Sequence, residues 1–348
     1  MSIQNNINTL RFAIIGCGRI AERHASIMQQ FGKIIAVCDI QKSKADALAA
    51  KYNSNAYQNA SEMFQAEPEI QMVAICSPNG LHAEHTLLAM ENGADVICEK
   101  PMALKLSDCH IMKSASEKSG RKIFVVKQNR YNPPIVQLKK WLDEGYLGRI
   151  LSVQVNAFWN RDPAYYHNSW KGTQDLDGGT LFTQFSHFVD IMYWLFGDMK
   201  VEHAMLDNLN HKGIIDFEDS GSVNVRFASG ALGNLNYNVN SHLKNLEGSI
   251  TLFAEKGTVK IGGQYLNELE YHSIDGIEKI HLPSGNKANE YGSYTGSMSN
   301  HELVYQNVID VLQGQSEMTT SLSDAMKTVE IIEEIYKIGK TNHEQTDH

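Results

Sequence analysis

The chain has 348 residues and a formal net charge of −9 at pH 7, with 42% hydrophobic and 20% charged residues. This length predicts two domains, and the excess of acidic residues disfavours non-specific binding to nucleic acid. An anionic ligand would therefore need a local cluster of basic residues.

Two further features bear on location and on metal binding. The sequence contains no run of about 18 apolar residues, so no transmembrane helix is expected, and the polar residues 1–9 lack the apolar core of a signal peptide. The cysteines form no CxxC pair, which disfavours a disulfide framework or a structural zinc site. They are Cys17, Cys38, Cys76, Cys98 and Cys109. We therefore expect a reduced, cytoplasmic protein without a metal ion.

The first predicted elements form a nucleotide-binding unit. An apolar strand over residues 12–15 runs directly into the glycine turn Gly16-Cys17-Gly18-Arg19-Ile20-Ala21. A helix is predicted over residues 20–31, and a strand over residues 34–38 ends at Asp39. This order is typical of dinucleotide-binding folds: a strand, a GxGxxA turn, a helix and a second strand that ends in an acid.

Each residue of this turn has an expected role. Gly16 and Gly18 let the backbone approach a pyrophosphate, and the helix start at Arg19 and Ile20 favours its negative charge. Asp39 would accept hydrogen bonds from the adenosine ribose and repel a 2′-phosphate. The expected cofactor is therefore NAD rather than NADP.

Strands and helices continue to alternate up to residue 127. The expected helices cover residues 42–52, 60–66, 81–92 and 107–120, and the expected strands lie near residue 56 and over residues 70–76, 95–98 and 122–127. Six strands that alternate with helices predict an α/β unit with a doubly wound parallel sheet, the Rossmann fold.

Ligands of such sheets bind at the carboxyl ends of the strands. Ser77 and Asn79 follow the strand over residues 70–76, and His82 opens the next helix. Ser77 and Asn79 face the cofactor, act as capping and turn residues, or do both. After the strand over residues 95–98 come Glu99, Lys100 and Pro101. Lys100 either reaches a substrate oxygen or is a solvated lysine at a strand end.

The pattern changes near Gln128, so we expect an NAD-binding domain over residues 1–128 and an α+β substrate and oligomerisation domain over residues 129–348. The second domain is predicted to contain a large, mainly antiparallel sheet with helices on one face. Its expected strands cover residues 150–159, 223–227, 235–239, 250–252 and 259–261, and its expected helices cover residues 135–145, 180–196, 300–313 and 323–339. The last helix could pack back on the first domain, and the tail after residue 340 is polar.

Two stretches of this half carry candidate substrate residues. The helix over residues 180–196 is apolar nearly all round and therefore predicted to be buried, yet Thr183, His187 and Asp190 form a polar stripe. His187 is either a structural core histidine or a general base. The segment over residues 160–173 follows Trp159 and mixes cations with aromatic rings, which suits a sugar or a nucleotide, unless it is an ordinary surface loop. Its candidates are Arg161, Tyr165, Tyr166, Trp170 and Lys171.

These motifs occur in an order that resembles the glucose–fructose oxidoreductase / inositol dehydrogenase (Gfo/Idh/MocA) family over nearly the whole chain. The motifs of the wider family are Gly16-Cys17-Gly18-Arg19-Ile20-Ala21, Cys76-Ser77-Pro78-Asn79 with His82, Glu99-Lys100-Pro101, and Gly178-Gly179 followed by His187 and Asp190. The chain also contains Val126-Lys127-Gln128-Asn129-Arg130, Phe158-Trp159 with Tyr165-Tyr166, Ser169-Trp170-Lys171-Gly172-Thr173 and Asn245-Leu246-Glu247-Gly248-Ser249-Ile250. These further stretches make it similar to the UDP-N-acetylglucosaminuronate 3-dehydrogenases of bacterial surface-polysaccharide pathways.

The resemblance implies an NAD-dependent oxidation of the sugar 3-hydroxyl to a ketone, in sugar biosynthesis for lipopolysaccharide O-antigen, ahead of an aminotransferase. It also implies a homotetramer built through the antiparallel sheet and a retained cofactor, which some members regenerate with 2-oxoglutarate. Alternatively, the substrate is UDP-N-acetylglucosamine, a free polyol or a glycoside. In a different class of function, the protein is a ligand sensor without turnover.

The resemblance also assigns roles. Lys100 would donate to the sugar 3-oxygen, His187 would take the hydroxyl proton, and the nicotinamide would lie near Glu99, Lys100 and Gln128. The wider family often has an aspartate where this chain has Thr183. A threonine can form hydrogen bonds but cannot act as a base. Proton transfer is therefore expected to fall on His187 and Lys100.

Overall fold

The computed structural model describes residues 10–290 and 295–346 and divides the chain into two compact units. The first unit contains Met1–Val126 and His301–Met326, and the second contains Lys127–Asn300 and Lys327–His348. The segment His301–Met326 therefore groups with the first unit, although it follows most of the second along the chain. Residues 1–9, on which the expectation about a signal peptide rests, lie outside the described residues.

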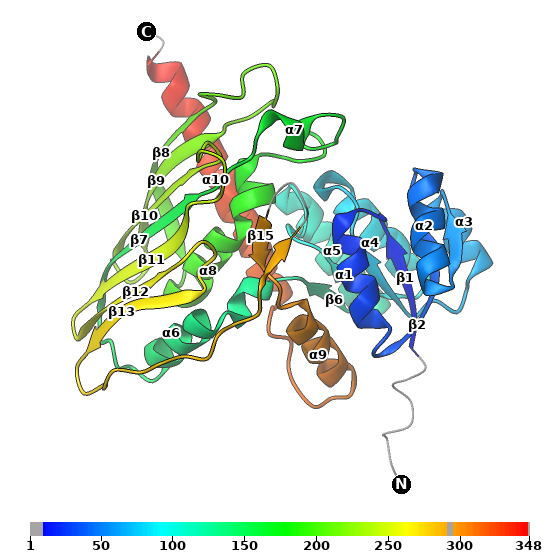
Figure 1. The fold of residues 1–348 in the computed structure, drawn as a ribbon, viewed down its shortest axis with the longest axis horizontal. Coiled ribbons are helices and arrows are strands. Elements are labelled where there is room, and N and C mark those ends of the chain that lie inside the picture. Colours follow the sequence, from blue (N-terminus) through cyan, green and yellow to red (C-terminus); the bar gives the residue numbers. More distant parts are fainter. Residues whose placement is uncertain (1–9, 291–294, 347–348) are drawn as a thin grey trace. The chain divides into compact units, whose positions relative to one another are not determined.

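The first unit contains a six-stranded parallel sheet in the order β3-β2-β1-β4-β5-β6. This is the doubly wound order of dinucleotide-binding domains, and it confirms the predicted Rossmann sheet (Figure 1). The strands are β1 (Leu10–Ile15), β2 (Gly32–Cys38), β3 (Asn55–Tyr57), β4 (Met72–Ile75), β5 (Asp95–Cys98) and β6 (Ile123–Val125). The helices are α1 (Arg19–Met28), α2 (Lys42–Tyr52), α3 (Ala60–Ala66), α4 (His82–Glu91), α5 (Leu106–Ser119) and α9 (His301–Leu312).

The central strands of this sheet are buried because their side chains are almost all apolar. All four residues of β4 are buried, and so are the last four residues of β1. Strands that are covered on both faces read as continuous apolar runs rather than as alternating ones. This burial holds the carboxyl ends of β1, β2, β4 and β5 along one edge of the sheet, where their turns carry the candidate cofactor residues.

The second unit contains a seven-stranded sheet in the order β13-β12-β11-β7-β10-β9-β8, which is antiparallel except for the parallel pair β7 and β10. Its strands are β7 (Ile150–Phe158), β8 (Met199–Asp207), β9 (Ser220–Phe227), β10 (Leu232–Asn238), β11 (Glu247–Ala254), β12 (Gly257–Gly262) and β13 (Glu268–Ile274). A separate ladder joins β14 (Ala288–Glu290) and β15 (Thr295–Met298). The mainly antiparallel sheet of the prediction is confirmed.

Helical segments cover one face of this sheet. They are α6 (Pro133–Asp143), α7 (Pro163–Tyr166), α8 (Ser186–Phe196) and most of α10 (Leu322–Thr346). Figure 1 shows α6, α8 and α10 on the same side of the strands, and none of the unit's described helices lies over the other side. The alternation along β7 follows from this arrangement, because Val153, Val155 and Ala157 are buried while the residues between them are not.

A row of polar side chains crosses the middle of the uncovered face of the sheet. Ser222, Asn236 and Asn156 lie opposite one another on β9, β10 and β7. The Asn236 side chain accepts from Ser222 Oγ at 2.9 Å and donates to Asn156 Oδ1 at 3.3 Å. Cross-strand hydrogen bonds of this kind stabilise the pairing of strands, and they make the middle of this face polar.

Three features of the second unit differ from the prediction. The helix expected over residues 180–196 begins as a π-helical turn, Leu181–Phe185, before α8. The edge strands β8 and β13 were not predicted, because their exposed outer faces give a weak hydrophobic pattern. Helix α10 continues beyond Gly339 to Thr346, through residues that were expected to form a tail. Among the described residues, none of the helices is both long and apolar enough to span a membrane.

Candidate active site

The glycine turn after β1 leaves room for a ligand against its backbone. Gly16 has φ +92°, and a Cβ atom there would lie 2.5 Å from the backbone of Cys76 and Ser77, so only glycine fits. A Cβ atom on Gly18 would meet nothing within 4 Å. Gly18 is also the N-cap of α1 and provides no side-chain cap. The helix thus begins at Arg19 and Ile20 directly beside the glycine turn, and the N-terminus of a helix favours an anion such as a pyrophosphate.

Asp39 is fixed beside this turn by backbone donors. Its Oδ2 accepts from Cys17 N at 2.8 Å, and its Oδ1 accepts from Gln41 N at 2.8 Å. The carboxylate therefore stands at the carboxyl end of β2, in the position where an acid binds ribose hydroxyls in dinucleotide-binding folds. The turn and this acid together fit NAD.

The candidates after β4 are mostly held by internal contacts. Ser77 and Asn79 are buried, and Ser77 Oγ lies 2.9 Å from His85 Nδ1. The ring of His82 bridges two turns, with Nδ1 2.6 Å from Pro101 O and Nε2 3.0 Å from Ser77 O. In this geometry His82 links the carboxyl ends of β4 and β5. The expected contacts of Ser77, Asn79 and His82 with the cofactor stay predictions.

Glu99 is the centre of a buried polar cluster at the end of β5. Its Oε1 lies 2.9 Å from His24 Nε2 and 3.2 Å from His301 Nε2, and His24 Nδ1 lies 2.7 Å from Tyr305 Oη. Burial alone would raise the pKa of Glu99, but the hydrogen bonds from His24 and His301 hold it well below its usual value. The carboxylate therefore stays ionised directly before Lys100.

His24, Glu99 and His301 also lie close enough together to be candidate ligands of a metal ion. Ring nitrogens that bind a metal normally donate their other N–H to a second partner. His301 Nδ1 is buried and has no hydrogen-bond partner among the described residues. Hydrogen bonds between the three side chains account for the cluster without an ion.

Lys100 follows this cluster and is half-buried. Its backbone N donates to Glu99 Oε2 at 3.2 Å, and its peptide bond to Pro101 is cis. The first unit thus brings Gly16, Gly18, Asp39, Glu99 and Lys100 to one edge of its sheet. Lys100 is the half-buried cation of this group.

In the second unit a buried ion-pair cluster surrounds Asp190. Its carboxylate accepts from Arg130 Nη2 at 2.8 Å and from Arg130 Nε at 2.9 Å, and Lys127 Nζ lies 3.2 Å away. Thr328 Oγ1 lies 3.2 Å from both Lys127 Nζ and Asp190 Oδ1. Burial would raise the pKa of Asp190, but Lys127 and Arg130 hold it well below its usual range. The cluster fixes α8 against the segment that begins at Lys127.

His187, one turn before Asp190 on α8, contacts Gln128. Gln128 Nε2 lies 3.2 Å from His187 Nε2 and 3.0 Å from Ser297 Oγ. Asn300 Nδ2 donates to the backbone oxygen of Gln128 at 3.2 Å. Gln128 Oε1 is buried without a partner among the described residues. The orientation of this amide decides whether Gln128 donates a hydrogen bond to His187 Nε2 or accepts one from it. The second unit therefore brings two sequence-predicted candidates, Gln128 and His187, together.

Thr183 has a different partner. Its hydroxyl donates to Asp177 Oδ1, while Asp177 Oδ2 accepts from Gly172 N at 2.7 Å. Asp177 is buried, so Thr183 lies beside a carboxylate that comes from the turn before the π-helical segment. The predicted stripe of Thr183, His187 and Asp190 is thus three side chains with three separate sets of partners.

The segment over residues 159–173 is built around Arg161. This side chain is 3% exposed, and its Nε donates to Gln184 Oε1 at 2.8 Å. Its guanidinium carbon lies 5.2 Å from the ring centroids of both Trp159 and Tyr165. These are distances of cation–π contacts. The second predicted cation, Lys171, is half-buried and places its Nζ 3.9 Å from the centroid of Tyr165.

The aromatic candidates differ in exposure. Tyr165 and Trp170 are half-buried, whereas Tyr166 is 6% exposed and packs edge-on against Tyr165. Part of the expected loop is a single helical turn, α7, which Asp162 caps by accepting from Tyr165 N at 3.0 Å. The segment thus presents Tyr165, Trp170 and Lys171 at its surface.

Several polar residues of these clusters were not identified from the sequence. They are His24, His85, Lys127, Arg130, Asp177, His301 and Tyr305. For Lys127 and Arg130 a signal was present, since two cations three residues apart directly follow an apolar strand. His24 and His301 are distant in sequence from Glu99, so no local pattern indicates their contact.

Comparisons with known proteins agree with this architecture. Residues 10–127 match the sequence model of the Gfo/Idh/MocA oxidoreductase family with an NAD-binding Rossmann fold, and residues 135–260 match the Gfo/Idh/MocA C-terminal domain. The WlbA dehydrogenase of Chromobacterium violaceum, solved with NADH and UDP-GlcNAcA, is 32% identical with a TM-score of 0.87, over 97% of this chain and 95% of that chain. The WlbA dehydrogenase of Bordetella pertussis, solved with the same two molecules, is 31% identical with a TM-score of 0.83, over 95% and 97% of the two chains.

A relative of Escherichia coli K12 named D-glucoside 3-dehydrogenase is 38% identical over 153 residues, which cover 42% of this chain and 43% of the relative.

Proposed function

Because the chain belongs to the Gfo/Idh/MocA family, and is an NAD-dependent oxidoreductase acting on sugar CH–OH groups, we propose that it oxidises the 3-hydroxyl of UDP-N-acetylglucosaminuronic acid to a ketone. The observation that carries the choice of substrate is the half-buried Lys171 ammonium over the ring of Tyr165. A sugar acid on a nucleoside diphosphate brings negative charges and a flat base, which match a cation and aromatic rings. The similarity to two dehydrogenases solved with UDP-GlcNAcA supports the same choice.

The cofactor site follows from the first unit. When bound, NAD accepts the hydride that leaves the sugar carbon. The backbone of Gly16, Gly18, Arg19 and Ile20 would hold its pyrophosphate, and Asp39 would accept from its adenosine ribose. The expected contacts on the nicotinamide side are Ser77, Asn79, His82, Glu99, Lys100 and Gln128.

Two side chains carry the proton chemistry in this proposal. Lys100 donates to the 3-oxygen and stabilises the negative charge that develops there. His187 takes the hydroxyl proton as a general base, and Gln128, 3.2 Å from its Nε2, fixes the ring. The proposal requires both Lys100 and His187 to reach the same sugar hydroxyl.

The remaining candidates would bind the rest of the substrate. Lys171 meets the carboxylate or the diphosphate, and Tyr165, Tyr166 and Trp170 pack against the rings. Thr183 contributes a hydroxyl that is already bonded to Asp177. The buried guanidinium of Arg161 holds Gln184 and the rings of Trp159 and Tyr165, so its contribution is to shape the segment that presents Lys171.

The assembly and the cellular role are part of the same proposal. The uncovered face of the seven-stranded sheet is the surface through which a homotetramer would form. Its row of Ser222, Asn236 and Asn156 would make that interface hydrated. The enzyme would act in the cytoplasm, in O-antigen sugar biosynthesis, and pass its ketone to an aminotransferase. The reduced cofactor would be reoxidised with 2-oxoglutarate or within that coupled reaction.

The test is incubation of the NAD-loaded protein with UDP-N-acetylglucosaminuronic acid, with reduced-nicotinamide absorbance as the readout. We expect reduction with this compound and much less with UDP-N-acetylglucosamine, which lacks only the carboxylate. If UDP-N-acetylglucosamine works as well or better, the sugar-acid assignment fails although the dehydrogenase assignment stands. If myo-inositol alone reduces the cofactor, the segment over residues 159–173 does not bind a nucleotide sugar.

A further inference from the structure

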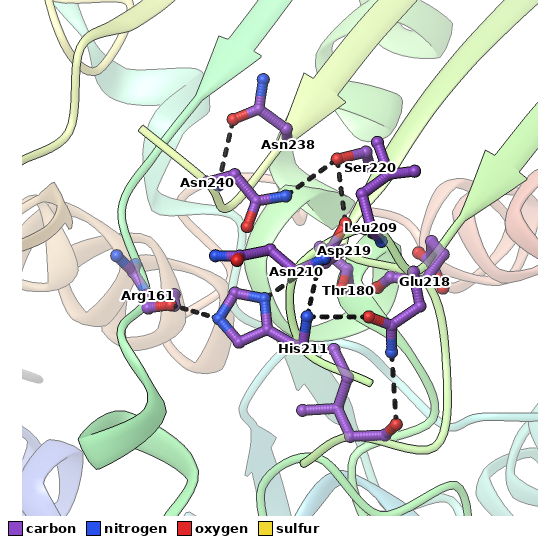
Figure 2. A network of polar contacts seen from close by, with 12 residues as sticks. Arg161, Thr180, Leu209, Asn210, His211, Glu218, Asp219, Ser220, Asn238 and Asn240 are labelled. Carbon is purple, nitrogen blue, oxygen red and sulfur yellow. Dashed lines mark hydrogen bonds and ion pairs between the residues drawn. The ribbon is translucent and has the colours of Figure 1, made fainter. Parts of the chain in front are cut away.

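A buried histidine outside the proposed chemistry links two loops at one end of the seven-stranded sheet. His211 is 1% exposed and lies in the loop between β8 and β9. Its Nδ1 lies 3.0 Å from Asp219 Oδ2, and its Nε2 lies 2.8 Å from the backbone oxygen of Arg161. Figure 2 shows the ring between these two groups. The same ring packs edge-on against Tyr166, with 5.5 Å between centroids.

The partners of His211 determine its protonation. A carboxylate and a carbonyl oxygen both accept, so each ring nitrogen must carry a proton to make both hydrogen bonds. The hydrogen bond to Asp219 raises the pKa of His211, burial opposes it, and the Arg161 carbonyl and the nearby Asp162 raise it further. The groups that face the ring are thus Asp219, Asp162, Tyr166 and the main chain of Arg161. The geometry fits an imidazolium paired with Asp219.

Asp219 is a fixed anchor for this ring. The residue is fully buried, and its carboxylate accepts from Leu209 N at 3.1 Å, from Asn210 N at 2.7 Å and from Ser220 Oγ at 3.0 Å. Burial would raise the pKa of Asp219, but the hydrogen bonds from His211, from Asn210 N and from Leu209 N hold it well below its usual range. The charge that pairs with His211 is therefore present across the neutral pH range.

The other end of the contact is the start of the proposed substrate segment. Arg161 N donates to Val239 O at 2.9 Å, and its side chain binds Gln184 and stacks against Tyr165. Gln184 Nε2 in turn donates to Tyr165 Oη at 2.8 Å. A shift of the Arg161 main chain would move this side chain, and with it the ring over which Lys171 lies.

We propose that His211 is a positioning residue, whose protonated ring ties the Arg161 main chain to Asp219 and thereby places Tyr165 and Lys171 for the anionic groups of the substrate. The inference rests on the proposed function for the identity of the substrate. The contact itself does not depend on that identity. His211 acts through Arg161 and has no part in the hydride or proton transfer.

The kinetic test compares His211→Gln with His110→Gln, a control at an exposed position on α5. Loss of a buried charge-assisted hydrogen bond should raise KM for UDP-N-acetylglucosaminuronic acid about tenfold in His211→Gln, with kcat and NAD affinity within about twofold of wild type. The control should match wild type. An unchanged KM in a folded His211→Gln protein, or an equal loss in kcat, overturns the proposal.

The pH profile separates positioning from a general loss of structure. Because the pKa of His211 is raised in the folded protein, the contact is complete at low pH and is lost as pH rises through that folded pKa. KM of the wild type should therefore rise with pH across this range, and KM of His211→Gln should not. Parallel profiles for the two proteins contradict the proposal.

Two measurements remain informative if the substrate assignment is wrong. Nitrogen-15 NMR of labelled histidine in the wild type should show two protonated ring nitrogens for His211 at neutral pH, and a neutral ring overturns the proposal even where the variant fails to fold. Hydrogen exchange by mass spectrometry should be faster over residues 161–173 in His211→Gln and unchanged in the control. If these results hold and UDP-N-acetylglucosaminuronic acid is not oxidised, the proposed function fails while the positioning role stands.

Discussion

His24 Nε2 lies 2.9 Å from Glu99 Oε1 and so connects the helix that follows the glycine turn to the residue directly before Lys100. His301 Nε2 lies 3.2 Å from the same oxygen. Both imidazoles come from helices of the first unit, α1 and α9. The buried carboxylate thus unites three segments that are far apart in sequence, at the edge of the sheet where the cofactor is expected.

We predict that Glu99→Gln destabilises the protein. The amide replaces one of the two accepting oxygens with an NH2 group, which then faces either the two histidines or the backbone N–H of Lys100. The expected cost is about 1–3 kcal/mol, measured by chemical denaturation at neutral pH with Glu91→Gln, an exposed position on α4, as the control. Because the pKa of Glu99 is lowered, its stabilisation is present above its unfolded pKa and is lost as pH falls. The difference between variant and wild type should therefore shrink in acid, and a constant difference would be incompatible with this account.

Asp39 is expected to make the protein prefer NAD over NADP. Its carboxylate is fixed by Cys17 N and Gln41 N, so it cannot turn away from a 2′-phosphate, and the like-charge clash costs several kcal/mol. Titration of both cofactors should show NAD binding about a hundredfold more tightly, and Asp39→Asn should narrow this ratio. Asp46→Asn, at an exposed position on α2, serves as the control. Equal affinities in the wild type would remove Asp39 from the site.

Lys100→Met keeps the length of the side chain but removes its charge and donors. Turnover should fall by about 10²–10³, the usual effect of losing one electrostatic group at the reacting oxygen. NAD should still bind, since the glycine turn and Asp39 are unchanged. Thermal unfolding should stay close to wild type, since the contact that the Lys100 backbone makes with Glu99 is kept. Near-normal turnover in the variant would make Lys100 a structural residue.

Glu218 is a buried acid whose pKa rises to about 7 because of its burial. Its Oε1 accepts from Tyr237 Oη at 3.0 Å and from Tyr336 Oη at 2.8 Å, whereas Oε2 has no partner among the described residues. A raised pKa in an acid means that the folded state loses stability as pH rises from the unfolded pKa to the folded one. Glu218→Gln should remove this loss, worth about 3 kcal/mol.

The measurement is urea denaturation of wild type and Glu218→Gln at several pH values between about 4 and 8. The variant should gain stability relative to wild type as pH rises, whereas Glu268→Gln, at an exposed position on β13, should show no such trend. A pH-independent difference would show that Glu218 stays ionised when buried.

Local patterns in the sequence were sufficient for most of the first unit. Helices α2 (Lys42–Tyr52) and α3 (Ala60–Ala66) have the predicted bounds, because a helix of this kind is set by its own periodicity and caps. The glycine turn and Asp39 could also be identified, since the strand, turn and helix that define them are contiguous.

Contacts between distant segments could not be predicted in this way. The π-helical turn Leu181–Phe185 is contacted by the distant Tyr336, whose hydroxyl accepts from Leu181 N at 3.1 Å. The partners of Glu99 lie 75 and 202 residues away along the chain. A single sequence carries the residue types of such clusters but not their pairing, so the burial of Arg161 and the role of His211 became visible only in the structure.

The central claim is oxidation at the sugar C3, and the most direct measurement follows the hydrogen on that carbon. UDP-N-acetylglucosaminuronic acid labelled with deuterium at C3 is incubated with the NAD-loaded protein, and the cofactor and sugar are analysed by mass spectrometry. This account predicts that the deuterium appears in the reduced cofactor and that the sugar loses it on becoming a ketone. Deuterium that stays on the sugar, in a reaction that nevertheless reduces NAD, would contradict oxidation at C3.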